Sequence, residues 1–552
     1  MPYARMVVAA TLCCLALSAS AAEPPRSYRE PAPLTKTRAL AADVVVYGGT
    51  PGGVAAAIAA ARCGKTAVLV SFNRHVGGMT SGGLTATDLG NEAAIGGFAR
   101  EFYAAIGRNT GFSCEVAEAT FRRLLAEAGV SVALEARLAG VGMGGPRIQQ
   151  LDLEHGGSVT GRYFIDATYE GDLFATAGCT YRVGREPVAE FDESCNGVQF
   201  LDEQQFVVDV DPYVTPGDPR SGLLPEISRE PETERPGAGD TKLQAFNFRM
   251  QLSNCPDRVP FPKPAGYDPG RYALLARFIA AAADTPWDFS YPKGPLHLAA
   301  GDSNNRGGFS TDFIGGNYRW ADGSYEPGAH AASLPIRRGL AVPLPELYRL
   351  REAIFQEHVT YQQGLLYFLA NDPAVPQAIR DQMAGWGLDP REFAATGHWP
   401  HQLYVREARR LVGEHMMTEH ECLGRRKAPE AVGLAAYNMD SHNCQRVAIT
   451  KEGRAVVRNE GDVQVRCPRP YPIAYRSLTP RRTECENLLV PVCLSATHIA
   501  YGSIRMEPVF MVLGQSAASI AIESIRSQVG VQEVDYDAVR KRLLADRQVL
   551  SR

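Results

Sequence analysis

Residues 43–71, DVVVYGGTPGGVAAAIAAARCGKTAVLVS, restrict the fold more than any other part of this 552-residue chain. The apolar run 44–47 predicts a strand buried on both faces, and the glycines of 48–53 predict a tight turn. A helix of small residues over 54–62 and a second strand over 66–70 follow. This order is half of a dinucleotide-binding βαβ unit. The unpaired N–H groups and positive dipole end of the helix would hold a pyrophosphate.

The turn departs from the usual G-x-G-x-x-G pattern at its third residue. It reads GGTPGG, so Thr50 stands where a second glycine normally lets the backbone approach the pyrophosphate. Thr50 either crowds the ligand or gives it a hydroxyl hydrogen bond. An ordinary turn of another α/β protein is the alternative, but the flanking strands and small-residue helix favour a dinucleotide site. We predict that the pyrophosphate contacts Gly48, Gly49, Thr50, Pro51, Gly52 and Gly53.

The end of the second strand differs from the pattern as well. An acid usually stands there and accepts a hydrogen bond from a ribose hydroxyl, whereas this chain has Ser71. The Ser71 hydroxyl can still form a hydrogen bond with a ribose, but it carries no negative charge. The sequence therefore constrains the adenosine end of the ligand less than the pyrophosphate.

The amino terminus has the pattern of a secretory signal peptide. Arg5 precedes an apolar run over 6–17, and Ala19-Ser20-Ala21 forms a small-residue cleavage pattern. A retained membrane anchor is the alternative. No later segment reads as apolar for long enough to span a bilayer. We predict a signal peptide over 1–22, a linker rich in proline and charge over 23–41, and a periplasmic or secreted protein with no membrane span once the signal is removed.

Charge and cysteine spacing exclude several classes of protein. Lys and Arg total 57 against 61 acids, a net charge of −4, which gives no electrostatic footprint for nucleic acid. Ten of the twelve cysteines remain once Cys13 and Cys14 leave with the signal peptide, and no two have CxxC spacing. This spacing argues against a zinc ribbon, a thioredoxin-type pair or a local iron–sulfur cluster. We predict no metal site, and a few disulfides are compatible with export.

The pattern along the chain suggests a nucleotide-binding domain interrupted by an insert. Glycine pairs in RHVGGMTSGGLTATDLG (74–90) suggest backbone pressed against a flat or anionic group. We expect helices over 96–107 and 114–129, then a β meander from 131 that turns at 155–157 and ends in a strand over 163–166. The glycine pattern stops between about 178 and 400, where aromatic loops and a helix over 344–371 suggest a substrate domain.

The last third returns to the first pattern. We expect a strand over 487–492, a loop through His498 and Tyr501, and a helix over 508–527. Arg406 and Glu407, with Arg409 and Arg410, read as a helix with a solvated face or an internal ion pair. The predicted units are a first nucleotide-binding part (43–178), an inserted substrate or cap domain (179–400) and a return segment (401–550).

Several long motifs resemble one known family. These are GGTPGGVAAAIAAARCGKTAVLV, RHVGGMTSGGL, FIDATYEGDLFATAG, GHWPHQLYVREARRLVG, YNMDSHNCQR, RNEGDVQV and VCLSATHIAYGSIRMEPVFMVLGQSAA. They resemble the bacterial FAD-dependent oxidoreductase family, whose members are often labelled xanthan-lyase-like and are distantly similar to the flavin domain of heterodisulfide reductase. The resemblance spans about 43–550. It implies an α/β, glutathione-reductase-like Rossmann FAD-binding domain with an inserted α+β substrate domain.

The resemblance also implies cofactor contacts beyond the first turn. The 74–83 segment would lie along the phosphates and flavin of FAD through Arg74, Gly77, Gly78, Met79, Gly82 and Gly83. Asp166, Ala167 and Thr168 match a second nucleotide-binding strand. A loop over 503–508, with Ser503, Arg505 and Met506, would approach the isoalloxazine ring, where positive charge stabilises reduced flavin. The extra cysteine clusters of heterodisulfide reductase are absent, so no iron–sulfur site is transferred.

A hydride acceptor still needs a group that moves the substrate proton. Histidine is the first candidate, and His398, His401, His442 and His498 lie in dense polar motifs. We favour His442 or His498 as the base, held in its tautomer by Asp440 or Asn443. A structural role remains open for each, most of all for His401. A polar loop with Asn304, Asn305 and Arg306 is either a pocket loop or a turn.

The sequence thus predicts an exported FAD-dependent oxidoreductase. It would transfer a hydride from a small polar organic substrate, for which a carbohydrate derivative is one candidate, and pass electrons to an unidentified acceptor. An electron-transfer flavoprotein with a redox protein partner is one alternative. A noncatalytic carbohydrate-binding protein that retains the fold is another.

Overall fold

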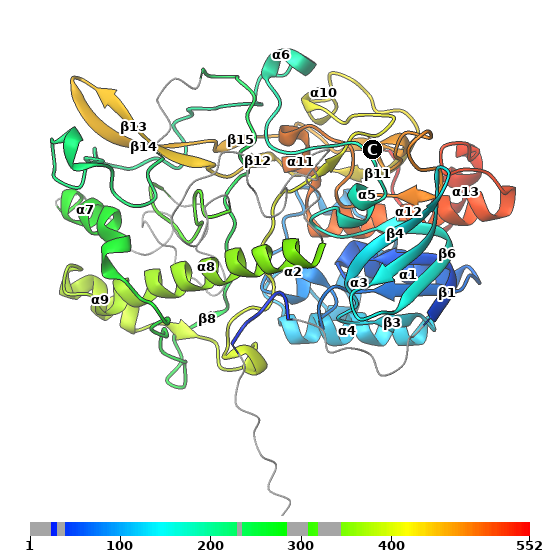
Figure 1. The fold of residues 1–552 in the computed structure, drawn as a ribbon, viewed down its shortest axis with the longest axis horizontal. Helices are drawn as coiled ribbons and strands as arrows, with labels where there is room; N and C mark the ends of the chain where they lie inside the picture. The colour runs from blue at the N-terminus through cyan, green and yellow to red at the C-terminus, as the bar shows by residue number, and fades with distance from the viewer. Residues whose placement is uncertain (1–23, 30–38, 229–234, 284–306, 318–343, 552) are drawn as a thin grey trace, which may run out of the picture.

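The chain folds around two hydrophobic cores that form two lobes. The computed structural model describes residues 24–29, 39–228, 235–283, 307–317 and 344–551. The predicted signal peptide, most of the predicted linker and the 304–306 loop lie outside these residues. In Figure 1 the lobe with the large sheet lies on the right, and the lobe with α7 (Ala273–Ala281), most of α8 (Leu344–Asn371) and α9 (Gln377–Ala384) on the left.

The large sheet is Rossmann-type, with the order β3-β2-β1-β6-β5-β4 and β17 paired to β6. The parallel strands are β3 (Ser131–Ala133), β2 (Ala67–Val70), β1 (Ala39–Tyr47), β6 (Ser158–Asp166) and β17 (Leu488–Leu489), and the antiparallel strands are β5 (Arg147–Leu153) and β4 (Leu138–Gly144). The strands predicted at 44–47, 66–70 and 163–166 are confirmed. β1 begins earlier than predicted, at Ala39, because its first residues pair with β6.

Helices cover this sheet where the small-residue pattern predicted. α1 (Pro51–Arg62) packs against α12 (Glu507–Ser527) so closely that a Cβ atom on Gly514 would lie 2.0 Å from the Gly52 carbonyl oxygen. α3 (Gly97–Ile106) and α4 (Cys114–Glu127) confirm the two helices expected after the glycine segment, and α13 (Tyr536–Ala545) follows α12. The alanine and glycine surfaces therefore serve close helix contact.

α12 corrects one expectation about apolar segments. By length and composition alone it qualifies as a membrane-crossing helix, whereas the sequence pattern indicated no such segment after residue 22. Its whole apolar window is buried inside the fold. Apolar residues on every face are also what a central core helix requires.

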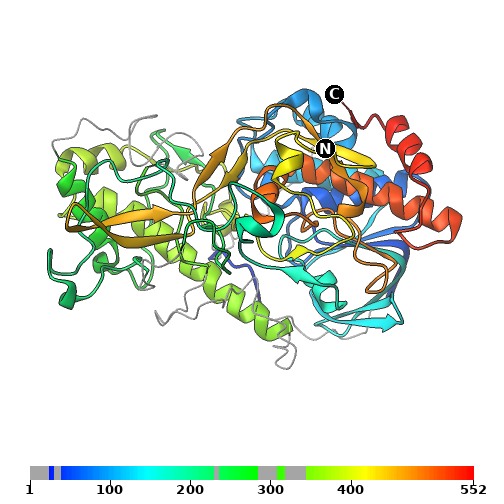
Figure 2. The same cartoon turned by 90° about the horizontal axis from the view of Figure 1, so that it is seen from above.

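The second lobe connects to the first through α8 and a short strand pair. The amino-terminal residues of α8, such as Tyr348, belong to the first core, and later ones, such as Leu365, to the second. β7 (Tyr181–Arg182) pairs antiparallel with β10 (Arg410–Leu411), where the chain leaves the first lobe and returns. Figure 2 shows the hairpin of β13 (Gln445–Lys451) and β14 (Arg454–Glu460) extending over the second lobe.

The remaining elements have at most seven residues each. They are α2 (Gly78–Ser81), α5 (Asp172–Thr176), α6 (Val188–Phe191), β8 (Leu252–Ser253), β9 (Gly387–Leu388), α10 (Glu419–Cys422), β11 (Ala431–Ala435), β12 (Met439–Ser441), β15 (Val463–Val465), β16 (Tyr471–Ala474) and α11 (His498–Ile504).

Residues 24–29 pack onto the body of the protein, which corrects the prediction of a linker for this part. The amides of Ser27 and Tyr28 donate to a Glu352 carboxylate oxygen of α8, at 2.8 and 2.6 Å. The Tyr28 hydroxyl donates to Glu154 at 3.0 Å, and its ring contacts Phe72. The proline and charge content predicted a spacer, but one aromatic side chain suffices to anchor it.

Candidate functional site

The glycine turn after β1 leaves no room for side chains. Gly48 has φ +118°, and a Cβ atom there would lie 2.5 Å from the Ala167 carbonyl carbon. A Cβ atom on Gly53 would lie 1.9 Å from the Gly48 carbonyl oxygen. Only glycine fits such contacts. The turn therefore places the amino terminus of α1 at the carboxyl ends of β1 and β6.

Thr50 caps α1, so its hydroxyl serves the protein and not the ligand. The hydroxyl donates to the Ala167 carbonyl at 2.7 Å and accepts from the Gly53 amide at 3.2 Å. This corrects the expectation that it bonds the pyrophosphate. A threonine at this position does the work of an N-cap, and its proton is already used.

Thr50→Ala should lower the free energy of unfolding by ~1 kcal/mol, because the cap is lost. Thr50→Ser keeps the hydroxyl and should retain most of the stability. Urea unfolding followed by circular dichroism measures both. An equal loss in the serine variant would contradict the capping role.

A partly open cavity, the first cavity, lies at the carboxyl ends of β1, β2 and β6. Six of the predicted cofactor-binding residues line it: Gly48, Gly49, Thr50, Ser71, Gly78 and Thr168. The others lie outside its lining. Residues that the sequence pattern did not assign to the cofactor complete the wall: Ser27, Tyr47, Phe72, Asn73, His75, Tyr169, Glu170, Asp172, Arg351, His401 and Gln402.

Ser71 lies at the end of β2, as predicted, with its hydroxyl directed at the His75 carbonyl oxygen, 3.2 Å away. The acid that is absent there has a counterpart after β6. Glu170 lines the first cavity, and burial raises its pKa to about 7. The neighbouring Asp172 is already paired with Arg351 at 2.6 Å and Arg409 at 3.0 Å. Glu170 stands in the quoted ATYEGD motif, but its role depends on where that loop folds.

The glycines of the 74–83 segment mostly press against protein, which corrects the expectation of a flat or anionic neighbour. Cβ atoms on Gly77, Gly82 and Gly83 would lie 2.2 to 2.5 Å from Phe121, Gln402 and Arg249, respectively. Gly78 faces the first cavity and the Tyr169 hydroxyl. These contacts arise because α2 is enclosed by α4 and by the segments that carry Arg249 and Gln402.

Two further side chains of this segment point away from the first cavity. Arg74 lies half-exposed and forms an ion pair with Glu135 at 3.5 Å, so its predicted cofactor contact is not made in this arrangement. Met79 is buried, and its amide donates to the Tyr169 hydroxyl at 3.0 Å.

Asp166 shapes the loop after β6 and does not reach the first cavity. Its carboxylate accepts from the Thr168 amide and hydroxyl and from the Phe174 amide, at 2.6 to 3.0 Å. Burial raises the pKa of Asp166 to about 6. Ala167 contributes its backbone to the glycine turn, and Thr168 faces the first cavity.

A second, partly open cavity adjoins the first and extends toward the second lobe. The two share Ser27, Asn73, Glu170, Arg351, His401 and Gln402. Its remaining walls are largely apolar, from Phe246, Ile354, Phe355, Leu403 and Val405, with Asn317 as a polar group. Together the cavities form a path from the glycine turn to the space between the cores.

His442 lies in a buried charge cluster with Asp312, Asp440, Arg406 and Arg505. Its Nδ1 atom lies 2.6 Å from Asp312, and its Nε2 atom lies 3.6 Å from Asp440. Arg406 pairs with Asp312 at 3.0 Å and Arg505 with Asp440 at 3.2 Å. None of these five residues lines the first or second cavity.

Asp312, which the sequence pattern did not single out, is therefore the group that orients Nδ1 of His442. Asn443 was predicted as an alternative, yet its side-chain oxygen has no hydrogen-bond partner among the described residues. Burial and Arg406 disfavour charge on His442, but Asp312 and Asp440 outweigh them and raise its pKa. The cluster is built to hold an imidazolium.

His498 begins helix α11, where a loop was predicted, and both of its ring nitrogens have partners. Nδ1 lies 2.7 Å from Glu407, and Nε2 lies 3.1 Å from the Ser441 hydroxyl. The helix forms because Thr497 accepts from the Ala500 amide and caps it. A ring bonded on both sides is less available as a base than His442.

The predicted 503–508 loop is shorter than expected. Ser503 belongs to α11, and its hydroxyl donates to the Tyr437 carbonyl at 2.6 Å. Only Arg505 and Met506 join α11 to α12. The Arg505 guanidinium bonds the Tyr404 hydroxyl at 3.1 Å and so belongs to the charge cluster.

Residues 403–410 contain no helix, which corrects the prediction: Tyr404 forms an isolated bridge with Asn247, and Arg410 begins β10. Glu407 and Arg410 form a buried ion pair at 2.7 Å, so the internal pairing is confirmed and the solvated face is wrong. Leu403 and Val405 line the second cavity, and the alternate residue Arg406 enters the charge cluster. One segment therefore separates the cavity from the cluster.

The chain matches the FAD dependent oxidoreductase family over residues 43–543. It belongs to this family. It is thus an FAD-dependent oxidoreductase, with FAD as its cofactor. No curated protein matches the chain.

Solved structures resemble parts of this oxidoreductase. THI4 of Thermovibrio ammonificans is 19% identical, covers 26% of this chain and 64% of its own, and has a TM-score of 0.22. A geranylgeranyl bacteriochlorophyll reductase-like protein of Thermoplasma acidophilum is 16% identical (25% and 42% covered, TM-score 0.18), and L-amino acid deaminase of Proteus myxofaciens is 13% identical (28% and 51% covered, TM-score 0.20). The chain spans less than two thirds of each of these structures, and with such TM-scores they carry no argument.

The first cavity of this oxidoreductase fits the pyrophosphate and adenosine of FAD. Gly49 contributes only backbone atoms to the wall of this cavity. A side chain at this position would clash, because a Cβ atom would lie 2.5 Å from the Ser71 hydroxyl oxygen. The amino terminus of α1 supplies a positive dipole end for phosphate. Ser71, Asn73 and Glu170 offer polar atoms for a ribose. The residues present therefore suit a dinucleotide.

Glu507, at the start of α12, provides a pH-dependent test of this region. Its carboxyl accepts from the Tyr169 hydroxyl at 2.8 Å, and burial raises its pKa from 4.5 to about 8. Because the folded-state pKa lies above the unfolded one, this group's stabilising contribution is lost as pH rises from about 4.5 to 8.

Glu507→Gln should therefore gain stability relative to the wild type across that window, by up to ~1.4 kcal/mol per pH unit. Urea unfolding at several pH values measures the difference. A difference that does not change with pH would contradict the raised pKa.

Proposed function

We propose that this oxidoreductase transfers a hydride from a small polar organic substrate to FAD, and that the substrate is a carbohydrate derivative bearing a carboxylate. The observation that carries the proposal is the first cavity at the glycine turn, continued by the second cavity between the cores. The pyrophosphate and adenosine of FAD occupy the first cavity. Substrate enters from the side of the second lobe.

The protein's own residues provide the proton chemistry beside the cofactor. Bound FAD supplies the hydride acceptor. We assign the substrate proton to Nε2 of His442. This atom lies behind the residues Leu403 and Val405 that line the second cavity, so the proposal requires this segment to shift when substrate binds. Asp312 holds Nδ1 and stabilises the imidazolium that results. Asp440 adds a second negative charge near Nε2, at 3.6 Å.

Arginines around the cluster favour an anionic substrate. Burial lowers the pKa of Arg406, and although Asp312 opposes this, the nearby guanidinium groups of Arg505 and Arg249 lower it further. Bringing a carboxylate among these cations relieves their repulsion. Arg505, which follows α11 directly, is also the candidate for positive charge beside reduced flavin.

The test is anaerobic reduction of the bound flavin by a panel of neutral sugars, sugar acids and amino acids. We expect loss of the oxidised-flavin absorbance with a sugar acid, and slower or no loss with the matching neutral sugar. Equal rates of flavin reduction by the sugar acid and the neutral sugar would contradict the proposal that the substrate bears a carboxylate. A holoprotein that stays oxidised throughout would contradict the substrate class.

Two alternatives have their own outcomes in the same experiment. A flavin that is reduced only by a reduced redox protein would favour an electron-transfer flavoprotein. A purified protein that lacks flavin and binds carbohydrate would favour a noncatalytic role. The polar cluster around His442 supports the catalytic alternative, because a binding protein has no need of a buried imidazole between two carboxylates.

Finer features of the fold belong to the same proposal. We take the first lobe as a glutathione-reductase-like FAD domain of a bacterial, xanthan-lyase-like protein distantly similar to the flavin domain of heterodisulfide reductase. Residues 179–400 form its α+β insert. The β7–β10 pair, where the chain leaves and re-enters the first lobe, supports this division.

Export to the periplasm or the medium is proposed from the leader, and two cysteine pairs support it. The Cys485 thiol lies close enough to Cys179 to raise its pKa, and burial together with the Cys467 thiol raises the pKa of Cys422. In an oxidising compartment such contacts become disulfides by exchange with a disulfide-bearing oxidant, which takes up the two electrons and two protons.

We expect the exported protein to contain both disulfides, seen as linked peptides in a non-reducing digest. Cys114, which is buried and carries no thiol partner among these pairs, should remain alkylatable after denaturation. Free thiols at all four positions in protein taken from the periplasm would contradict the proposal.

A further inference from the structure

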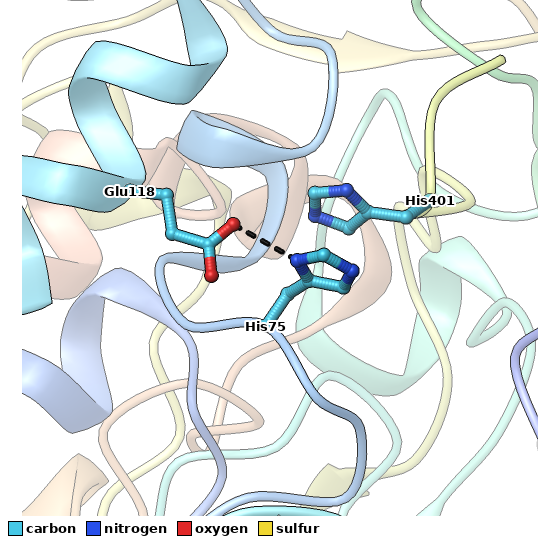
Figure 3. A group of neighbouring side chains, drawn as sticks. All are labelled: His75, Glu118 and His401. Atoms are coloured by element: carbon cyan, nitrogen blue, oxygen red, sulfur yellow. Dashed lines mark hydrogen bonds and ion pairs between the residues drawn. The ribbon is translucent and has the colours of Figure 1, made fainter. Parts of the chain in front are cut away.

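Two histidines and a glutamate meet beside the first cavity, outside the charge cluster. They are His75, which follows β2, Glu118 of α4, and His401, which precedes the 403–410 segment. One potential ligand atom from each lies within 4.8 Å of the others. Figure 3 shows the Glu118 carboxylate and the two imidazole rings converging from three separate segments.

Glu118 is held as a carboxylate with one oxygen directed at the histidines. Its Oε2 atom lies 2.9 Å from Nδ1 of His75. Its Oε1 atom accepts from the Arg122 guanidinium at 2.6 and 2.9 Å. Arg122 thus orients the carboxylate so that Oε2 faces His75.

His401 presents a buried nitrogen that has no partner. Its side chain is 9% exposed, and Nε2 makes no hydrogen bond within the described part of the chain. A buried polar atom without a partner is costly and calls for an explanation. In Figure 3 a ring nitrogen of His401 is directed toward Glu118 and His75.

The rings of His75 and His401 are stacked, with centroids 3.7 Å apart and planes 9° from parallel. The lone pair of each ring lies in the plane of that ring, and the two planes are stacked, so one ring must turn for both nitrogens to meet a single ion. Neutral imidazole nitrogens and an ionised carboxylate are the ligands that zinc-class ions prefer.

We propose that His75, Glu118 and His401 bind one divalent transition-metal ion of the zinc class, through two imidazole nitrogens and one carboxylate oxygen. His75 and His401 also line the first cavity, so the fourth position faces it and takes water or an oxygen donor. The ion would connect the 74–83 segment and α4 to the start of the return segment. The site adds to the FAD chemistry and does not depend on it.

The experiment uses the full mature holoprotein, treated with a chelator and then titrated with Zn²⁺ by calorimetry. Metal content after gel filtration and flavin content are measured on the same samples. His401→Ala and Glu118→Gln each remove one ligand. His398→Asn is the matched control, because His398 lies on the same loop, bonds the Glu392 carbonyl and stands outside the cluster, and asparagine tolerates its φ of +65°.

We expect one Zn²⁺ per chain in the wild type and in His398→Asn, with a higher Tm when zinc is present. Binding should weaken at least ~10- to 100-fold in the two ligand variants, since even changes next to a ligand cost this much. Retained flavin and circular dichroism would show that those variants are folded. Equal zinc binding in all four proteins, or no stoichiometric zinc in the wild type, would overturn the proposal and leave a stacked histidine pair.

Discussion

Replacing His442 with asparagine slows reduction of the bound flavin by substrate about 10²- to 10⁴-fold, the usual contribution of a general base. The reason is geometric: Asp312 holds Nδ1 at 2.6 Å, so Nε2 is the nitrogen left to take a proton. Stopped-flow anaerobic reduction measures the rate. Flavin content should not change, because His442 lines neither cavity.

The pH profile separates this role from a structural one. Neutral His442 is the active form, and its pKa is raised above the 6.5 of an ordinary histidine by Asp312 and Asp440, against the opposing effects of burial and Arg406. The wild-type rate should therefore rise with pH through a pKa above 6.5. The asparagine variant should lack this rise.

His498→Asn is the matched comparison. Both nitrogens of His498 already have partners, Glu407 and Ser441, so its loss should lower stability more than it slows reduction. If instead His498→Asn removed the pH-dependent step and His442→Asn did not, the assignment of the base would be reversed.

Gly49→Val should give a folded protein that retains little FAD, with affinity lowered ~100-fold or more, equivalent to about 2.7 kcal/mol. A Cβ atom at Gly49 would lie 2.5 Å from the Ser71 hydroxyl oxygen, and the valine methyl groups would enter the first cavity. Rotation of Ser71 relieves this contact and leaves close ones of 3.1 Å to its Cβ atom and 3.3 Å to the His75 carbonyl oxygen, so circular dichroism checks that the variant is folded. Flavin absorbance per chain after dialysis measures retention.

Gly142→Val on β4 is the control, because a Cβ atom there meets Gln150 at an ordinary 3.6 Å. It should keep its flavin. Full flavin occupancy in Gly49→Val would place the pyrophosphate elsewhere.

Local patterns predicted the first lobe well because its elements are set by neighbouring residues. Alanines and glycines required α1 and α12 to pack closely, and β1, β2 and β6 follow from their apolar runs. Thr50 shows the limit of motif reading. The position looked like a ligand contact, but the nearby Ala167 carbonyl takes its proton.

The site depends on residues that are far apart in sequence. Asp312 reaches His442 from 130 positions away, and no spacing rule links them. His75, Glu118 and His401 likewise meet only once α4 and the return segment fold onto the glycine segment. The same cause explains the 403–410 segment, whose arginines suggested a helix although they pair with buried acids in a segment that contains no helix.

The role of the first cavity is tested most directly by identifying the flavin that denaturation releases from the purified protein. Because this cavity is assigned to a pyrophosphate and adenosine, we expect about one FAD per chain, lost in Gly49→Val and kept in Gly142→Val. FMN in place of FAD, or a colourless protein that does not take up added FAD, would contradict the assignment.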